Sequence, residues 1–199
     1  MNLITEFEDS PMLKFVYKNM SYFLDNPIRR WFNDPVKKIK AAGIRSGMDV
    51  LEVGCGSGYF TIPAAELVGE EGCLHAIDIH PIAIETVSRR IKESNLKNVI
   101  LSKTNALETG LPNESYDLIL LFGVIPAPVL PPERLLPEMH RLLKPEGKMA
   151  VWTAFPLWSP RSFTEYGLFT YVGNKDGVHI YARAKPTSRE FQKSWRYNE

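Results

Sequence analysis

Cysteine is scarce in this chain, and neither sign of charge is in excess. Cys55 and Cys73 are the two cysteines among 199 residues, and their spacing suits neither a disulfide framework nor a metal site. The 24 Lys and Arg residues are nearly balanced by 23 Asp and Glu residues, which leaves a formal net charge of +1 and gives no reason to expect a polyanionic partner. The composition therefore predicts reduced thiols, no metal and no nucleic-acid partner.

Long apolar runs and targeting signals are also missing. No apolar stretch approaches the roughly 18 residues of a membrane span. The acidic start M-N-L-I-T-E-F-E-D-S lacks the basic and then apolar order of a signal peptide. We therefore expect a cytoplasmic protein, and 199 residues are enough to bury one substantial core in one domain.

From Met48 onward, apolar runs of strand length alternate with amphipathic runs of helix length, which is typical of a parallel sheet covered on both faces. The expected strands are 48–53, 73–78, 98–103, 116–122, 147–153, 168–173 and 177–183. The expected helices are 58–68, 81–94 and 133–143, with stops at Gly69, Asn95 and Pro145-Glu146-Gly147. Because Asn174-Lys175-Asp176-Gly177 is a hairpin signal, we predict an α/β, Rossmann-like doubly wound fold. Its mostly parallel seven-stranded sheet would end in a C-terminal antiparallel hairpin.

The two ends of the chain differ in character from this alternating core. Residues 1–45 are rich in aromatic residues and are divided into short, helical pieces by Pro11, Pro27 and Pro35. We expect them to form an N-terminal helical lid on a core of residues 46–184. Residues 185–199 are mostly polar and are expected to be a frayed tail.

The segment V-L-E-V-G-C-G-S-G-Y-F, residues 50–60, carries most of the functional information. A strand that leads into glycines at 54, 56 and 58 and then into a helix lets the backbone approach a ligand closely, with free amides at the helix start. Glu52 at the strand end would repel a pyrophosphate but suits a cationic or hydroxyl-rich ligand. This combination favours S-adenosylmethionine over a dinucleotide.

Four elements in order resemble the class I S-adenosylmethionine-dependent methyltransferases: E-V-G-C-G-S-G, then Asp78 at the end of the next strand, then Y-D-L-I-L-L-F-G, then R-L-L-K-P-E-G-K-M-A-V-W. The likeness covers roughly residues 46–154. It is strongest to the small-molecule, quinone-biosynthesis-like group called methyltransferase type 11. The resemblance implies an enzyme that moves a methyl group from S-adenosylmethionine to a small organic acceptor by in-line displacement.

The resemblance also implies which residues hold the methionine and ribose parts of the cofactor. Gly54, Gly56 and Gly58 would pass beneath them, and Asp78 would accept both ribose hydroxyls. Asp78 could instead cap the helix that starts at Pro81. Glu52 would orient the methionine end, or it could simply accept hydrogen bonds from the amides of the turn.

The remaining contacts implied by the resemblance lie at the ends of other strands. Ile79 would cover the adenine, and Asn105-Ala106 stands where the family often has an aspartate followed by an apolar residue. Phe122-Gly123 would border the crevice at the end of the fourth strand. Tyr17, from the lid, is a further candidate for cofactor contact, although its aromatic neighbours could equally just cover the sheet. The catalytic residues stay unassigned, and the side chains weighed as a general base are His80, His140, Tyr17 and Tyr22.

Other functions are compatible with parts of this pattern. A non-catalytic module that binds S-adenosylmethionine or S-adenosylhomocysteine would use the same pocket. A nicotinamide oxidoreductase is disfavoured because Tyr59 stands where the Gly-x-Gly-x-x-Gly spacing is not met. Aminopropyl transfer is disfavoured because the aspartate-rich signature expected after the fourth strand is missing. The acceptor and the oligomeric state are not predicted.

Overall fold

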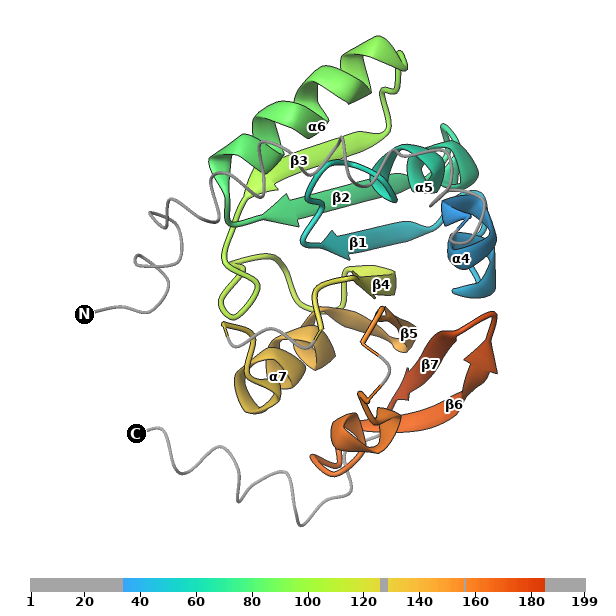
Figure 1. The fold of residues 1–199 in the computed structure, drawn as a ribbon, viewed down its shortest axis with the longest axis vertical. Coiled ribbons are helices and arrows are strands. Elements are labelled where there is room, and N and C mark those ends of the chain that lie inside the picture. Colours follow the sequence, from blue (N-terminus) through green and yellow to red (C-terminus); the bar gives the residue numbers. More distant parts are fainter. Residues whose placement is uncertain (1–33, 126–128, 156, 185–199) are drawn as a thin grey trace, which may run out of the picture.

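The computed structural model describes residues 34–125, 129–155 and 157–184. A seven-stranded sheet with the order β3-β2-β1-β4-β5-β7-β6 runs through them (Figure 1). All neighbours from β3 to β5 are parallel, and β7 runs antiparallel to both β5 and β6. The strands are β1 (Asp49–Val53), β2 (Cys73–Asp78), β3 (Val99–Lys103), β4 (Tyr116–Phe122), β5 (Leu143–Trp152), β6 (Phe169–Lys175) and β7 (Val178–Arg183). The predicted sheet and its C-terminal hairpin are confirmed.

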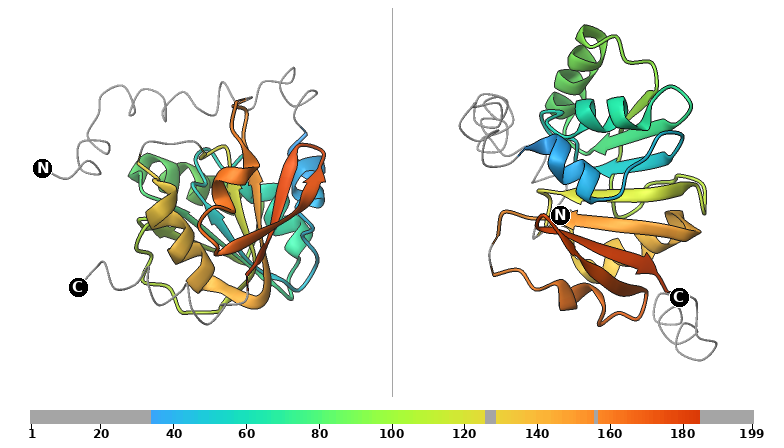
Figure 2. Two further views of the ribbon diagram at one scale, coloured as in Figure 1. Left: turned by 90° about the horizontal axis from the view of Figure 1, so that it is seen from below. Right: turned by 90° about the vertical axis from the view of Figure 1, so that its right-hand side faces the viewer.

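Helices cover the two faces of the sheet unequally. One core cluster joins Leu118 and Leu120 of β4 to α4 and α5, whereas the alternate residues Ile119 and Leu121 belong to a second cluster with α7. Since successive strand residues point to opposite faces, α4 and α7 lie on opposite sides of the sheet (Figure 2, left). The helices are α4 (Pro35–Ala41), α5 (Thr61–Val68), α6 (Pro81–Glu93), α7 (Pro132–Leu142) and the short 3-10 helix η1 (Pro160–Phe163).

Two predicted boundaries are wrong, each for a local reason. The helix expected at 58–68 begins at Thr61, because Gly58 still belongs to the turn and has a φ of 79°. The expected stop at 145–147 lies inside β5, which starts at Leu143. Between the pairs Tyr116–Leu143 and Leu118–Lys148 the register shifts, so 145–147 form a bulge in the strand rather than a turn before it.

The N-terminal helix α4 is the described part of the expected lid. Pro35 occupies its first turn, and the Asp34 side chain accepts a hydrogen bond of 2.9 Å from the Val36 amide, which is a normal helix start. An ion pair of 2.9 Å from Lys37 to Asp176 ties α4 to the β6–β7 hairpin. Tyr17, Tyr22 and the polar tail lie outside the described residues, so the lid and the tail stay predictions.

No helix in the described ranges is both long and apolar enough to cross a membrane.

Candidate cofactor-binding site

The crevice between β1 and β4 lies where the order of the strands reverses. From β1 the chain continues to β2 and β3 on one side, and it then returns to β4 and β5 on the other. Open α/β sheets bind ligands outside the carboxyl ends of their strands at such a point. Gly54 follows β1 there, and a Cβ on it would lie 2.3 Å from Cγ1 of Val124, just after β4. Only glycine therefore fits where the two strand ends meet.

The glycine turn after β1 is shaped by backbone conformations that favour glycine. Gly54, Gly56 and Gly58 have φ values of 75°, 53° and 79°. The Gly54 amide donates to the Ile77 carbonyl at 2.8 Å, and the Gly58 amide donates to the Cys55 carbonyl at 2.8 Å. The turn is thus anchored to the end of β2, and a side chain at any of the three positions would strain it.

Asp78 ends β2 and supports the turn directly. It is 4% exposed. Its Oδ2 accepts from the Gly56 amide at 2.9 Å, and its Oδ1 accepts from the His80 amide at 2.9 Å. The alternative role as a helix cap is wrong, because α6 is capped by His80, whose Nδ1 accepts from the Ile82 amide at 3.2 Å. Each carboxylate oxygen has two acceptor sites, so these two amides do not by themselves fill the acceptor capacity of Asp78.

Glu52 is buried inside the same end of the sheet. Its side chain is 2% exposed, and its Oε2 has no hydrogen-bond partner among the described residues. Burial raises the pKa of Glu52 to about 8; the nearby Thr61 hydroxyl opposes that rise without reaching hydrogen-bond geometry, and the charge of Asp78 adds to it. Because the three turn glycines donate elsewhere or to Asp78, the alternative role of Glu52 as acceptor for their amides is wrong.

Unsatisfied buried polar atoms gather around this turn. The Ser57 hydroxyl in the turn and the Thr61 hydroxyl at the start of α5 also have no partner within the described part of the chain. Buried polar groups in native proteins are nearly always paired, and an unpaired one costs about 1–3 kcal/mol. A bound molecule with a positive charge and hydroxyl or amine donors would satisfy these oxygens, which fits S-adenosylmethionine.

The residues expected near the adenine lie after β2 and β3. Ile79 is half-buried directly after Asp78. The Asn105 Oδ1 accepts from the Leu107 amide at 3.0 Å, so its carbonyl oxygen already shapes its own loop. Ala106 is buried in the core cluster on the α7 face. The exocyclic amine of adenine requires a hydrogen-bond acceptor, and the acceptor oxygen of Asn105 is already used. Asn105 therefore offers its amide N–H groups, which are donors, more readily.

Phe122 and Gly123 differ in what they present at the end of β4. The Phe122 ring is buried and packs edge-on against Phe60, with 5.0 Å between ring centroids, and against Trp152 at 6.5 Å. Gly123 is exposed, and its amide donates to the Trp152 carbonyl at 2.8 Å. Trp152 was missed by sequence reasoning. The sequence feature that could have identified Trp152 is its position at the end of the fifth strand, beside the crevice.

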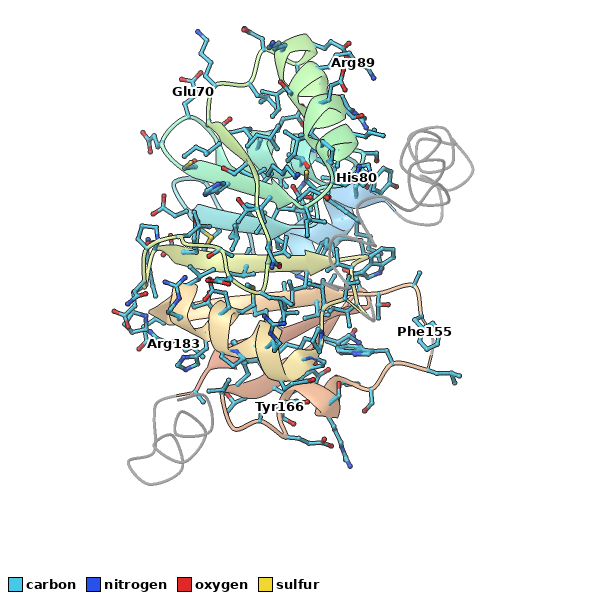
Figure 3. All side chains as sticks on the ribbon, turned by 90° about the vertical axis from the view of Figure 1, so that its left-hand side faces the viewer. Glu70, His80, Arg89, Phe155, Tyr166 and Arg183 are labelled. Carbon is cyan, nitrogen blue, oxygen red and sulfur yellow. The ribbon has the colours of Figure 1, made fainter. Side chains whose placement is uncertain are left out.

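The two histidines weighed as a general base serve the fold instead. His80 is buried at the first turn of α6 (Figure 3), where its Nδ1 acts as the helix cap. His140 is buried on α7, where its Nε2 lies 3.1 Å from the Ala184 carbonyl. The helical segment M-H-R-L-L-K around His140 is typical of an exposed structural histidine, but the structure buries this side chain. Within the described ranges, no group of three or more His, Cys, Asp or Glu side chains could hold a metal ion.

Comparisons with known proteins agree with this geometry. A family model described as "Methyltransferase domain" matches residues 44–163. Aklanonic acid methyltransferase DauC of Streptomyces sp. is 43% identical over 75 residues, which cover 38% of this chain and 34% of that protein. Demethylmenaquinone methyltransferase of Listeria welshimeri is 32% identical over 122 residues, which cover 61% of this chain and 50% of that protein. The chain thus spans half the length of these relatives or less.

Solved structures share the fold over more of the chain. A SAM dependent methyltransferase from Aquifex aeolicus superposes with a TM-score of 0.70 at 25% identity, covering 82% of this chain and 96% of that one. A second structure, from Methanococcus maripaludis, has a TM-score of 0.68 at 18% identity, covers 88% of this chain and 95% of that one, and supports the fold alone. With a family model that covers more than half of its residues, the chain belongs to the methyltransferase-domain family, in the class I S-adenosylmethionine-dependent group that its glycine motif predicted.

Proposed function

We propose that this protein transfers a methyl group from S-adenosylmethionine to a small organic acceptor. The observation that carries the proposal is the pair of buried carboxylates, Glu52 and Asp78, beside a glycine turn that no side chain could replace. Glu52 at this position would repel the pyrophosphate of a dinucleotide, whereas the two acids together complement an ammonium group and ribose hydroxyls.

Each residue of the site has a role in this proposal. Asp78 accepts the ribose hydroxyls while it holds the Gly56 amide, and Glu52 receives the charged amino end of the methionine part. Ile79 covers the adenine, and the Asn105 amide hydrogen-bonds its edge. Phe122 supports the crevice from beneath, since its ring is part of the aromatic cluster with Phe60 and Trp152. Tyr17 stays a candidate for contact from the lid.

The chemistry that the cofactor supplies is an electrophilic methyl group on a sulfonium. The protein then needs mainly to align the acceptor and to exclude water, and positioning of this kind can contribute roughly 7–11 kcal/mol. A general base is optional, which agrees with the structural roles of His80 and His140. The names of the relatives, aklanonic acid and demethylmenaquinone methyltransferases, support a small organic acceptor. The near-neutral charge supports the absence of nucleic acid, and the cytoplasmic location stays a prediction.

The test is the affinity for S-adenosylhomocysteine, measured by calorimetry on the full chain. Replacing Asp78 by Ala should weaken binding by about 1–3 kcal/mol, because the ribose hydroxyls lose their acceptor. Glu93→Gln, an exposed carboxylate at the end of α6, is the matched control and should leave the affinity unchanged. No binding by the unmodified protein at millimolar cofactor would refute the proposal, and equal affinity of Asp78→Ala would refute the role of that residue.

A non-catalytic binding module remains the second candidate, and it is favoured by the placement of both histidines in structural roles. Binding experiments do not separate it from an enzyme. Incubation with methyl-labelled S-adenosylmethionine and a panel of phenolic, quinol and carboxylate acceptors does, because an enzyme transfers label to one of them. Binding without transfer to any acceptor would support the module.

A further inference from the structure

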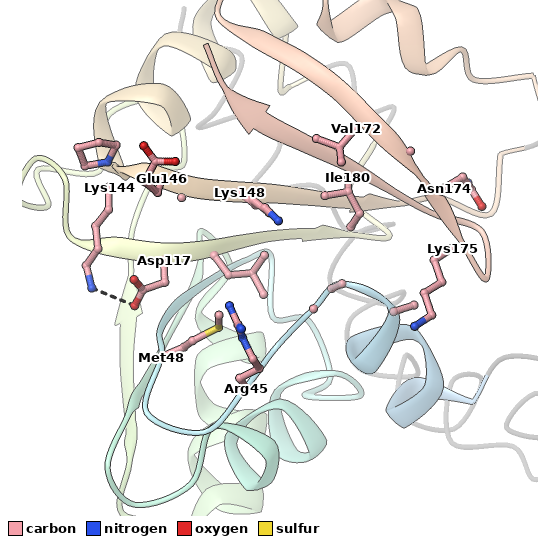
Figure 4. Close-up of a pocket in the computed structure, with 17 residues that line it drawn as sticks. Arg45, Met48, Asp117, Lys144, Glu146, Lys148, Val172, Asn174, Lys175 and Ile180 are labelled. Carbon is pink, nitrogen blue, oxygen red and sulfur yellow. Dashed lines mark hydrogen bonds and ion pairs between the residues drawn. The ribbon is translucent and has the colours of Figure 1, made fainter. Parts of the chain in front are cut away.

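A second cavity lies away from the glycine turn, on the sheet face that α4 and α5 partly cover. It is a groove of about 710 Å³ that begins near the amino ends of β1, β4 and β5 and extends over β7 beside α4 (Figure 4). This volume falls within the range of small-molecule sites, roughly 300–1,000 Å³. The helix α4 beside it has seven residues, and small residues line the borders of the groove: Ala41, Ala42, Gly43, Gly147 and Gly173.

The floor of this groove is apolar. Leu118 of β4 and Ile180 of β7 point to the same face of the sheet, where both contribute to the core cluster with α4. Val172, at an irregularity of β6, is 57% exposed and lies beside Ile180 (Figure 4). A hydrocarbon chain laid over these side chains would be removed from water at about 25 cal/mol per Å² of apolar surface.

The rim of the groove carries an excess of positive charge. Four cations line it, Arg45, Lys144, Lys148 and Lys175, against two acids, Asp117 and Glu146. Lys144 is already neutralised, with 2.9 Å from its Nζ to Oδ2 of Asp117 and the same distance to Oδ2 of Asp49.

Two of the remaining cations converge on the groove. Arg45, from the loop after α4, and Lys148, from β5, reach into it from opposite sides (Figure 4). Neither side chain makes a hydrogen bond or ion pair with a described residue, although the charge of Arg45 helps to lower the pKa of Asp117 in the same groove. Glu146 lies toward the Lys144 end of the groove (Figure 4), and Asp117 is held by Lys144 and by the Asp49 amide. An anionic group between Arg45 and Lys148 would therefore gain two charge-assisted contacts.

We propose that this groove is a second binding site, for an anionic amphiphile: a small molecule with a hydrocarbon body and one carboxylate or phosphate group. The anion lies between Arg45 and Lys148, and the hydrocarbon body lies on Ile180 and Val172. The site is separate from the cofactor crevice, since Met48 and Gly54 at the two ends of β1 are six residues apart, or about 20 Å of strand. The inference does not depend on the proposed methyl transfer.

The experiment uses decanoate as probe and the methyl NMR signals of two isoleucines as reporters. Ile180 lies in the groove, and Ile79 lies at the cofactor edge. Titration of the full chain should shift the Ile180 signal saturably, with a dissociation constant below about 1 mM, and should leave Ile79 unmoved. A shift of Ile79 with Ile180 constant would place the ligand in the crevice and would overturn the proposal.

Variants test the charge and the apolar floor separately. Arg45→Gln combined with Lys148→Gln should weaken decanoate binding at least about tenfold, whereas Lys92→Gln, an exposed residue of α6, should leave it unchanged. Decanol and inorganic phosphate should each bind at least about tenfold more weakly than decanoate. Equal binding of decanol, equal binding of phosphate, or an unaffected double variant would each overturn the proposal. If the double variant does not fold, the decanoate titration of the unmodified protein, followed by the two isoleucine signals, still tests whether the ligand binds in the groove.

Discussion

Acidic residues lie near both ends of strand β1, but their surroundings differ between the two ends. At the amino end, Asp49 and Asp117 share the ammonium group of Lys144 at 2.9 Å each. At the carboxyl end, Glu52 and Asp78 are nearly fully buried, and Oε2 of Glu52 has no hydrogen-bond partner among the described residues. The first pair is neutralised by Lys144, whereas the buried Glu52 oxygen has no partner within the described part of the chain.

The difference separates a structural ion cluster from a site that fits a ligand. Partial burial opposes the ionisation of Asp117, yet the Asp49 amide and Lys144 hold the pKa of Asp117 below its usual range. Burial instead raises the pKa of Glu52 to about 8. Since ionising a buried carboxyl group is costly without a compensating charge, a cationic ligand at the carboxyl end would favour the charged form of Glu52.

The pH dependence of stability should show the contrast most strongly. The unfolded Glu52 ionises near pH 4.5 and the folded one near pH 8, so the folded cofactor-free protein holds the extra proton between these values. The contribution of Glu52 to the free energy of unfolding therefore falls as pH rises through this window, by on the order of 4 kcal/mol. Glu52→Gln removes this loss, and urea unfolding at pH 5, 6, 7 and 8 measures the difference between variant and unmodified protein.

That difference isolates Glu52, because all other titrating groups are common to both proteins. The lowered pKa values of histidines such as His75 and His140 make the free energy of unfolding rise with pH. This contribution is the same in both proteins and cancels in the difference. A difference that stays constant from pH 5 to 8 would mean that Glu52 is ionised in the folded state. The carboxyl end would then resemble the amino end.

A Cβ at position 54 should have the next largest effect. Gly54→Ala places a methyl carbon 2.3 Å from Val124 and keeps a φ of 75°, so overpacking and strain together should lower the free energy of unfolding by about 2–4 kcal/mol. The matched control is Gly110→Ala, which has a φ of 69° but nothing within 4 Å and reports the strain alone.

Adding Val124→Ala to Gly54→Ala identifies the clash itself. The double variant should regain the part of the free energy of unfolding that overpacking removed. Its remaining loss should be close to that of Gly110→Ala, as measured by urea unfolding at one pH. If the double variant is as unstable as Gly54→Ala, the close approach of β1 and β4 is not what requires glycine there.

Sequence reasoning can identify features that depend on neighbours along the chain. The glycine turn, Glu52 and the end of β2 at Asp78 are local features. Their residue types predict a cofactor site, and the role of each residue in it stays a prediction. The alternation of strands and helices is also a local feature, and it predicted the sheet and its terminal hairpin. The exact start of α5 was missed because a glycine turn and a helix start look alike in sequence.

Features that depend on distant contacts could not be predicted in this way. Lys144 stands between an expected helix and the expected stop at 145–147, but it lies within β5 and contacts Asp49, a residue 95 positions earlier. His140 has the surroundings of an exposed helical residue in sequence, yet Phe169 and the Ala184 carbonyl cover it. The groove likewise brings together residues that are distant in sequence, such as Arg45 and Ile180.

The ion cluster at the amino end should show the smallest effect, and it tests the structural half of the comparison. Lys144→Gln leaves Asp49 and Asp117 without their shared cation, and both ion pairs are partly exposed. We therefore expect a loss of only about 1 kcal/mol in the free energy of unfolding. The matched control is Lys148→Gln on the same strand, which breaks no ion pair of the described residues and should change stability by less than about 0.5 kcal/mol.

The pKa of Lys144 is raised above 10.5 by Asp117 and Asp49, so its contribution is complete below that value and is lost as pH rises beyond it. The loss caused by Lys144→Gln should therefore be the same at pH 5 and pH 8, where the effect of Glu52 changes most. It should also shrink in 1 M salt, which screens partly exposed charges. A loss that grows between pH 5 and 8 would contradict the assignment, because it would mean that the acids at the amino end are also uncompensated in the folded protein.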